Sequence, residues 1–229
     1  HMYKILRNEK ISESSYLLTI KCPIVIKNAM PGQFIIVMSK EDSERIPLTI
    51  YDYNLDNGTL DLIYQVVGAS TKELSENKDA VFAITGPLGK PNEICKNYED
   101  YKGKRIVYVA GGVGIAPVYP QVKYLKEKGF TIDVIYGARS KDLLLIKDKI
   151  EHVASKVYYV TDDGTYGEKG FVTDILKKHI NEYDICVAIG PVIMMKNVAE
   201  LTKEYNLKTI VSMNPIMVDG TGMCGACRC

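Results

Sequence analysis

The C-terminal residues of this 229-residue sequence carry a dense group of metal-binding side chains. Asp219, Cys224, Cys227 and Cys229 stand in "VDGTGMCGACRC", separated mainly by glycine and alanine. The spacing D-x4-C-x2-C equals the C-x4-C-x2-C run that ligates plant-type [2Fe–2S] clusters, with aspartate in place of the first cysteine. A carboxylate is anionic and can coordinate iron, and small residues suit a loop wrapped around a cluster. We therefore predict a [2Fe–2S] site; the alternatives are a redox pair and a tail with incidental thiols.

A glycine-rich turn, "VAGGVGIAP" at Val109–Pro117, joins a predicted strand to a predicted helix. Gly111, Gly112 and Gly114 allow a tight turn and the close approach of a pyrophosphate, and the helix N-terminus offers unpaired amides. Pro117 suits the first helical turn because no amide is needed there. This proline replaces the third glycine of the standard dinucleotide fingerprint. The alternative interpretation is a plain tight turn between strand and helix.

Two further motifs could bind phosphate. In "RIPLTI", Arg45 could pair with a phosphate, and the Thr49 hydroxyl with nearby amides could meet a ring nitrogen, which makes Thr49 the candidate catalytic residue. In "VVGASTKEL", a strand ends at Gly68, and Ser70 and Thr71 cap a short helix whose N-terminus could hold a diphosphate. The alternatives are an edge-strand arginine beside a loop proline and an ordinary helix cap.

The two halves of the chain, which must position these groups, have different patterns. Up to about Asn97, short β-branched and aromatic runs are separated by turn signals such as Asn57-Gly58, which predicts an antiparallel sheet or small β-barrel. From about Lys102, strands alternate with helical patterns, which predicts a doubly wound parallel α/β sheet. The helical patterns include residues 116–129, 141–153, 172–180 and 192–206. We expect a barrel at residues 3–98, an α/β domain at 102–212 and a cluster-binding segment at 213–229.

Composition excludes several classes of protein. The chain is 46% hydrophobic and 25% charged with a net charge of +1, so nucleic acid is not expected as the main partner. No apolar run approaches the roughly 18 residues of a membrane helix, and no secretion signal is evident, so we expect a cytoplasmic protein without a membrane span. Cys22, Cys95 and Cys186 stand singly, and Cys186 lies in a predicted buried strand where a thiol acts as a small hydrophobe.

The order of motifs is specific. R-x-P-L-T is followed by G-x-S-T, by G-P-L-G at residues 86–89, by G-G-x-G-x-A-P and by G-P-x-x-M-M at residues 190–195. The whole chain from Tyr3 resembles the ferredoxin-NADP reductase superfamily, in which a β-barrel binds flavin and an α/β domain binds nicotinamide dinucleotide. The resemblance implies FAD on the barrel and NAD(H) on the second domain. It implies contacts to the flavin and ribityl chain from Arg45, Pro47, Leu48 and Thr49, to the FAD pyrophosphate from Gly68, Ser70 and Thr71, and to the nicotinamide nucleotide from Gly111, Gly112, Gly114, Pro117, Gly190, Pro191 and Met194.

The stretch "TDDGTYGEKG" and the cysteine tail resemble two branches of that superfamily. One is the electron-transfer subunit of dihydroorotate dehydrogenase, whose members resemble one another in having cysteine at the first three cluster positions. The other is the small subunit of NADH-dependent reduced ferredoxin:NADP oxidoreductase, which the aspartate at position 219 favours. That branch implies an electron-bifurcating complex with a larger flavin and iron–sulfur subunit, which works on NADPH and ferredoxin. A non-catalytic flavin-binding module is a third alternative.

Two details follow from the resemblance. Superfamily members that use NADPH carry a serine-arginine pair after the third strand of the second domain, whereas this chain has Asp162 and Asp163, which would repel a 2′-phosphate and favour NADH. Arg139, at the neighbouring strand end, could still reach a phosphate. The family's fourth cluster cysteine stands well beyond the third, so Cys229 and a residue outside this sequence are both candidates for the fourth ligand.

Overall fold

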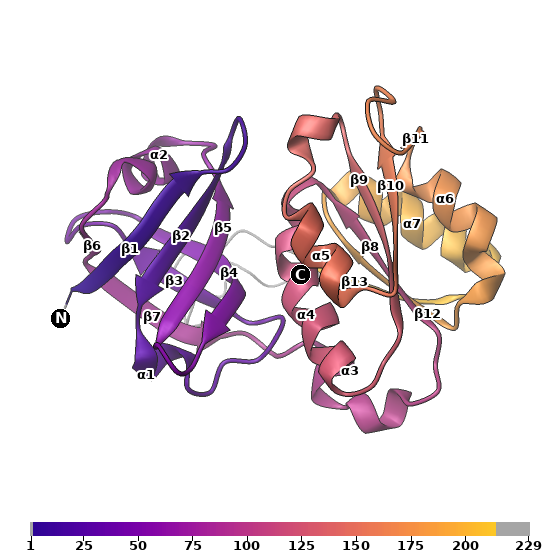
Figure 1. Ribbon diagram of the computed structural model, residues 1–229, viewed down its shortest axis with the longest axis horizontal. Coiled ribbons are helices and arrows are strands. Elements are labelled where there is room, and N and C mark those ends of the chain that lie inside the picture. The colour runs from indigo at the N-terminus through magenta and orange to yellow at the C-terminus, as the bar shows by residue number, and fades with distance from the viewer. Residues whose placement is uncertain (1, 214–229) are drawn as a thin grey trace. The chain divides into compact units, whose positions relative to one another are not determined.

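The computed structural model describes residues 2–213, and the chain forms two compact units within them. The first extends to Asn92, and the second is Glu93–Met213. The division falls a few residues before the polar stretch at 99–103 that the sequence favoured, because a short helix before that stretch and a 3-10 turn that overlaps it belong to the second unit. The fold class, an antiparallel barrel followed by a parallel α/β sheet, is confirmed (Figure 1).

The first unit is a seven-stranded antiparallel sheet with two short helices. Its strand order is β6-β1-β2-β5-β4-β3-β7. The elements are β1 (Tyr3–Lys10), β2 (Ser15–Lys21), α1 (Pro23–Ile26), β3 (Phe34–Met38), β4 (Arg45–Asn54), β5 (Thr59–Gln65), α2 (Ala69–Glu76), β6 (Ala80–Val81) and β7 (Ala83–Leu88).

One segment closes this sheet into a near-complete barrel. β6 pairs with β1 at one end of the strand order, and β7, only one residue later, pairs with β3 at the other end. Phe82, between them, donates its main-chain N–H to Met38. Closure removes exposed sheet edges, and the barrel interior is filled by side chains such as Leu18, Ile35 and Leu62, which are fully buried.

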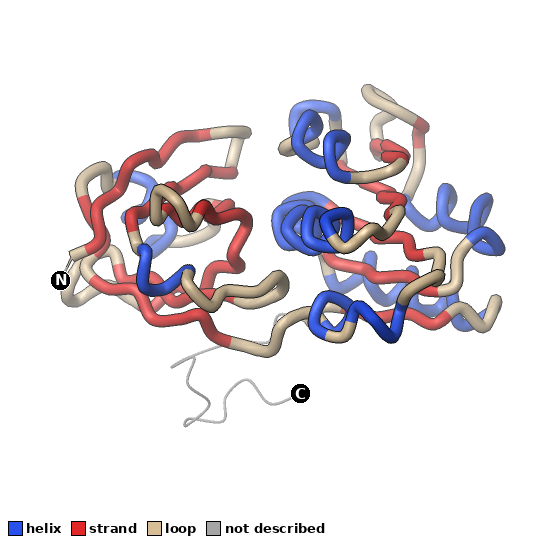
Figure 2. Tube along the Cα trace, turned by 60° about the horizontal axis from the view of Figure 1, so that its bottom comes forward, coloured by secondary structure: helices blue, strands red, loops and turns tan. Residues whose placement is uncertain are grey.

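The second unit is a six-stranded parallel sheet with helices on both faces (Figure 2). Its strand order is β11-β10-β9-β8-β12-β13. The elements are α3 (Glu93–Lys96), η1 (Tyr98–Tyr101), β8 (Ile106–Gly111), η2 (Gly112–Gly114), α4 (Ile115–Glu127), β9 (Ile132–Ala138), η3 (Lys141–Leu143), α5 (Lys147–Val153), β10 (Lys156–Thr161), β11 (Glu168–Lys169), α6 (Val172–His179), η4 (Ile180–Glu182), β12 (Ile185–Ile189), α7 (Val192–Glu204) and β13 (Lys208–Val211).

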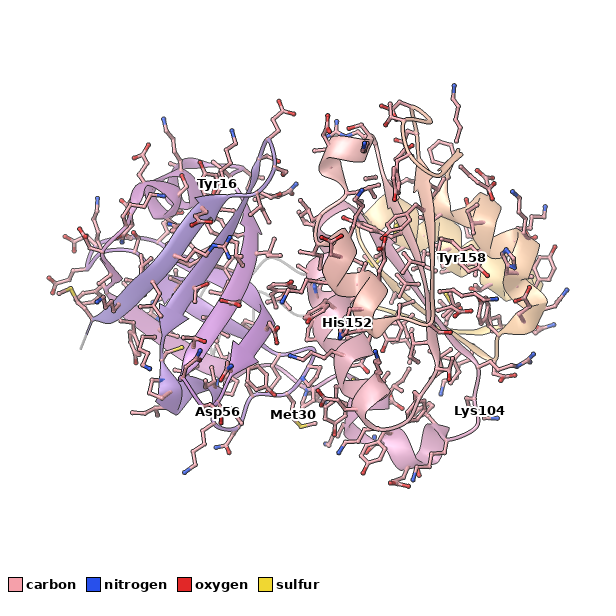
Figure 3. All side chains as sticks on the ribbon, in the orientation of Figure 1. Tyr16, Met30, Asp56, Lys104, His152 and Tyr158 are labelled. Carbon is pink, nitrogen blue, oxygen red and sulfur yellow. The ribbon has the colours of Figure 1, made fainter. Side chains whose placement is uncertain are left out.

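The central strands of this sheet are covered on both sides. Every residue of β8 and β12 is buried, as expected for a parallel sheet between two helical layers. α6 packs on one face with α7, and α4 packs with α5, which carries His152 (Figure 3). Lys126 of α4 donates to the main-chain oxygen of His152. Cys186 lies in β12 and is fully buried, which confirms the structural role predicted for it. Burial raises the pKa of its thiol to about 12, so it stays protonated.

The helix predicted over residues 141–153 is wrong in its first half. Residues Lys141–Leu143 form a 3-10 turn, and Ile146 takes a left-handed conformation with φ of 47°, so α5 begins only at Lys147. Leu144 and Leu145 are buried although they lie in a loop. Their apolar side chains match the spacing expected of a helix, which explains the wrong prediction. Among residues 2–213, no helix is both long and apolar enough to cross a bilayer.

Candidate functional site

The glycine turn after β8 has an open space above its backbone. Gly112 has a φ of 56°, a conformation that favours glycine, and a β-carbon built on it would meet no atom within 4 Å. α4 begins directly after the turn, with Pro117 in its first turn as predicted. A helix N-terminus presents main-chain amides and the positive end of the helix dipole. The turn can therefore admit a pyrophosphate close to its backbone.

The turn after β12 interlocks with the turn after β8. A β-carbon on Gly111 would lie 2.5 Å from the Met194 sulfur and 3.0 Å from Cδ of Pro191. A β-carbon on Gly190 would lie 2.8 Å from the Met194 methyl carbon. Gly111 thus lies against the Gly190–Met194 segment, which is far from it in the sequence, and the close approach requires glycine at positions 111 and 190.

These two turns lie at the topological switch point of the sheet. β8 is the first strand of the unit, and the chain continues to β9 on one side and later to β12 on the other. In doubly wound sheets, ligands bind in the crevice outside the carboxyl ends of the strands at this point. Pro191 precedes the first residue of α7, so α4 and α7 both begin at this edge of the sheet. The sequence motifs and the topology therefore select the same position for a ligand, outside the carboxyl ends of β8 and β12.

Asp162 and Asp163 lie at the same sheet edge, two strands away from the glycine turn. Their main-chain amides donate to Ala138 and Arg139, which continues the pairing of β10 with β9. Two strand spacings correspond to about 10 Å. The Asp163 carboxylate accepts hydrogen bonds from the main-chain and side-chain groups of Thr165, which lower its pKa. The Asp163 carboxylate is therefore engaged in hydrogen bonds within its own loop. Asp162 is also exposed and is the better candidate for contact with a ribose.

In the first unit, the predicted flavin contacts lie on two opposite faces of β4. Arg45 and Pro47 are exposed and Thr49 is half-buried, whereas Ile46 and Leu48 point into the barrel core. Arg45, Pro47 and Thr49 therefore share a face that a ligand can reach. The Leu48 side chain is 8% exposed and packs in the core, so only its main chain is available to a ligand.

The first half of β4 has one open edge. Its pairing with β5 covers Ile50–Asn54, whereas its pairing with β3 extends back to Arg45. The amide of Ile50 donates to Gln33 on the β3 side. Because successive residues in a strand point their amides to opposite sides, the amide of Thr49 points toward the open edge. Proline is tolerated at position 47 because its main-chain nitrogen, which has no hydrogen to donate, faces that open edge.

The N-terminus of α2 lies beside the start of β4. Thr71 reaches back to accept hydrogen bonds from the amides of Val67 and Gly68, at 3.0 and 3.2 Å, so Gly68 is the cap position and Thr71 completes it. Ser70 donates its hydroxyl to the Glu44 carboxylate, next to Arg45. Sequence patterns alone did not reveal Glu44, which joins the two predicted FAD motifs.

The four predicted cluster ligands, Asp219, Cys224, Cys227 and Cys229, lie outside the described residues. Within residues 2–213 there is no group of three or more histidine, cysteine or acidic side chains arranged to hold a metal ion. The cluster prediction therefore depends on the sequence alone.

Known proteins match this chain over both units. Residues 108–200 match the oxidoreductase NAD-binding domain family. A homologue of the dihydroorotate dehydrogenase B electron-transfer subunit from Thermotoga maritima is 46% identical over 98% of this chain and 79% of its own length. The chain therefore belongs to the family of dihydroorotate dehydrogenase B electron-transfer subunits and their homologues. It is an NAD-binding electron-transfer subunit of the ferredoxin-NADP reductase superfamily, as the motif order predicted.

Other members of this family and superfamily extend the comparison. The dihydroorotate dehydrogenase B electron-transfer subunit of Clostridium acetobutylicum is 32% identical over 99% of this electron-transfer subunit and 87% of its own length. A solved structure of the NADH-dependent reduced ferredoxin-NADP oxidoreductase, described for flavin-based electron bifurcation, superposes with a TM-score of 0.88 at 40% identity. That match covers 100% of this chain and 82% of the other.

Proposed function

We propose that this chain is the FAD- and [2Fe–2S]-containing subunit of an NADH-dependent ferredoxin:NADP oxidoreductase. In this proposal the subunit exchanges hydride with NAD(H) and single electrons with a larger flavin and iron–sulfur subunit, which acts on NADPH and ferredoxin in a bifurcating complex. The observation that carries the proposal is the 0.88 TM-score and 40% identity to the ferredoxin-NADP oxidoreductase structure over the whole chain. Aspartate at position 219, in place of a first cluster cysteine, favours the same branch.

The residues of the first unit fit FAD. The first intrahelical hydrogen bond of α2 runs from Lys72 to Gly68, so the amides of Ala69, Ser70 and Thr71 precede it and are available to a diphosphate. Arg45 would add a cation for the phosphates, and the open edge of β4 with Thr49 would meet the flavin ring. The Glu44 carboxylate must turn away from Ser70 when an anionic diphosphate binds there, because like charges repel.

The residues of the second unit fit NADH. The open backbone at Gly112 would hold the pyrophosphate, and the contact of Gly111 with Met194 would limit the space beside the nicotinamide. Asp162 would accept hydrogen bonds from ribose hydroxyls and repel the 2′-phosphate of NADPH. When bound, the flavin would accept a hydride from NADH and release electrons singly, as an iron–sulfur cluster requires.

A second candidate is the electron-transfer subunit of a dihydroorotate dehydrogenase. It is favoured by the printed names of relatives such as the Thermotoga maritima and Clostridium acetobutylicum proteins. That subunit would have the same cofactors and the same hydride chemistry but a different catalytic partner. The two candidates therefore differ in the partner's substrate and in the first cluster ligand.

The test is to tag the chain in its native host and purify it without oxygen. Heat-released cofactor should run with the FAD standard, because the α2 amides suit a diphosphate that FMN lacks. The co-purifying complex should reduce ferredoxin and NAD⁺ together at the expense of NADPH. A complex that instead reduces NAD⁺ with dihydroorotate and is inactive with NADPH would overturn the main proposal in favour of the second candidate.

A further inference from the structure

The hydroxyl of Tyr136, in β9, joins two loops of the second unit. It donates to the main-chain oxygen of Gly112 at 3.1 Å and accepts the amide of Leu145 at 2.9 Å. A weaker contact to the main-chain oxygen of Leu143 is longer, at 3.5 Å. Tyr136 itself is fully buried. One buried hydroxyl thus connects the glycine turn after β8 with the loop before α5.

The orientation of the Gly112 carbonyl determines the orientation of the amide that follows it. Gly112 is the residue of the turn with a positive φ, and its carbonyl also accepts the amide of Ile115 at the start of α4. A trans peptide unit points its C=O and N–H in opposite directions. Holding the Gly112 oxygen toward the buried Tyr136 hydroxyl therefore directs the amide of Val113 away from the interior, toward a ligand above the turn.

Burial keeps this hydroxyl in the form that can donate. Desolvation raises the pKa of Tyr136 above its ordinary value, so the O–H is intact throughout the physiological range. Phenylalanine at this position would keep the ring but leave the buried Leu145 amide without its acceptor and the Gly112 oxygen with one donor fewer. Unpaired buried polar groups are costly, so the turn and the loop would be expected to rearrange.

We propose that Tyr136 is a positioning residue for nicotinamide nucleotide binding, which holds the Gly112–Val113 peptide in the orientation that receives the pyrophosphate. This inference rests on the proposed function, in which the glycine turn holds NADH. Tyr136 acts through the turn and touches neither the flavin nor the reacting atoms in this proposal. Its loss should therefore weaken NADH binding without slowing hydride transfer from the NADH that is bound.

The experiment is anaerobic stopped-flow reduction of the flavin at rising NADH concentration, on the purified holoprotein. Tyr136→Phe should raise the apparent Kd for NADH about tenfold, or about 1.4 kcal/mol. The limiting rate should stay within about twofold of wild type, and the FAD content should not change. A Kd equal to that of wild type would overturn the proposal, and so would a lower limiting rate at unchanged Kd.

Tyr159→Phe is the matched control. The Tyr159 ring lies 6.2 Å from the Tyr136 ring between centroids, but its hydroxyl donates to the Glu151 carboxylate and not to the glycine turn. It should leave the Kd for NADH unchanged, and an equal effect of both variants would overturn a specific role for Tyr136. Gly112→Ala tests the proposed site itself, because alanine is strained at a φ of 56°. If Gly112→Ala does not weaken NADH binding, the proposed site is wrong; if only Tyr136→Phe has no effect, the positioning role is wrong.

A measurement on the wild-type protein covers the case in which Tyr136→Phe does not fold. Amide hydrogen exchange followed by NMR should show slow exchange at Leu145, although it lies in a loop, because its N–H is bonded to a buried hydroxyl. Saturating NADH should slow exchange at Leu145 as well as at Val113, since both depend on the same hydroxyl. Protection at Val113 with no change at Leu145 would contradict the proposal.

Discussion

Gly114, at the start of α4, is so close to the end of β12 that a β-carbon on it would lie 2.3 Å from the carbonyl oxygen of Ile189. Real β-carbons do not approach a backbone oxygen so closely, and Gly114 has an ordinary helical conformation, with φ of −58°. The reason for glycine is therefore the approach of β12 and not the shape of the turn. This contact fixes the two turns of the candidate nucleotide site against each other.

Gly114→Ala should consequently destabilise the second unit by about 2 kcal/mol, the middle of the range for overpacking a well-packed site. It should also weaken NADH binding, because the helix start and the β12 turn must separate. Urea unfolding and NADH titration measure the two effects. Gly68→Ala is the control, since a β-carbon there meets no atom within 4 Å and its φ of −163° is extended. Similar losses of stability in the two variants would contradict this explanation.

Arg45→Ala should weaken FAD binding. An exposed guanidinium next to the α2 terminus has no fold-stabilising ion pair within the described residues, and a charge-assisted hydrogen bond to phosphate contributes about 1.5–3 kcal/mol. The Kd for FAD should rise roughly tenfold to hundredfold, as measured by reconstitution of the apoprotein. Arg105→Ala removes the same charge from the second unit, where Arg105 pairs with Asp184 at 2.9 Å, and should not change the Kd for FAD. Equal FAD affinity in wild type and Arg45→Ala would remove Arg45 from the site.

Asp162→Ser should reduce the preference for NADH over NADPH. Removing the carboxylate abolishes repulsion of a 2′-phosphate, so the ratio of flavin reduction rates should shift toward NADPH by about tenfold or 1.4 kcal/mol. Arg139, whose main-chain oxygen pairs with Asp163, lies close enough in the fold to contribute to phosphate binding in the variant. An unchanged ratio in Asp162→Ser would exclude this residue as the determinant.

Asp163→Ala is the informative companion variant, because it removes the oxygen that accepts both hydrogen bonds from Thr165. The Asp163 carboxylate accepts these bonds at 2.9 and 2.7 Å, and Thr165 in turn accepts the amide of Lys141. This variant should loosen the 162–167 loop and weaken both nucleotides together, with less effect on their ratio. A change in the ratio equal to that of Asp162→Ser would show that the two aspartates share one role.

The sequence predicted the fold class and selected the residues of the candidate nucleotide site because the evidence for them is local. The glycines at 111–114 and the segment at 190–195 each indicate a turn at the end of a strand. The alternation of strands and helices then places both turns at the same edge of the sheet. Tyr136 could not be found in this way. It stands in a buried strand where any large apolar residue would fit the pattern, and its role depends on a carbonyl 24 positions earlier.

Two other differences have similar causes. The contact of Glu44 with Ser70 joins segments 26 positions apart, which no local pattern reports. The helix predicted at 141–153 was interrupted because Ile146 adopts a left-handed conformation that β-branched residues rarely take, while Leu144 and Leu145 kept the apolar spacing of a helix. Tertiary packing overrode the pattern at that point.

The ion pair of Arg105 with Asp184 should contribute to the pH dependence of stability. The Arg105 guanidinium and main-chain amide hold the pKa of Asp184 at about 2, below its ordinary 3.8. Because the folded-state pKa is the lower one, the stabilisation is present above pH 3.8 and is lost as the pH falls toward 2. The urea midpoints of wild type and Asp184→Asn should therefore differ at neutral pH and converge in that window. The difference should be small, because both side chains of the pair are partly exposed to solvent.

Cluster assembly tests the residues that lie outside the described structure. Cys224→Ala and Cys227→Ala should each abolish a [2Fe–2S] cluster, because thiolate ligands are lost at the two-residue interval that places sulfurs on one iron–sulfur unit. Asp219→Cys should keep the cluster and change its reduction potential, since a carboxylate is a harder and weaker donor to iron than a thiolate. Iron analysis, visible absorbance and a redox titration followed by EPR measure these outcomes.

Cys229→Ala addresses the fourth ligand. Loss of the cluster in this variant would identify Cys229 as that ligand, whereas retention would point to a residue outside this sequence. Cys22→Ala is the control for the loss of a thiol, because Cys22 is buried in the first unit and burial raises its pKa to about 12. If iron content and spectrum are unchanged in both Cys224→Ala and Cys227→Ala, the segment is not the cluster site. An unchanged potential in Asp219→Cys would remove the aspartate from the ligand set and leave the cysteines in it, because replacing oxygen by sulfur on iron must alter the charge that the metal experiences.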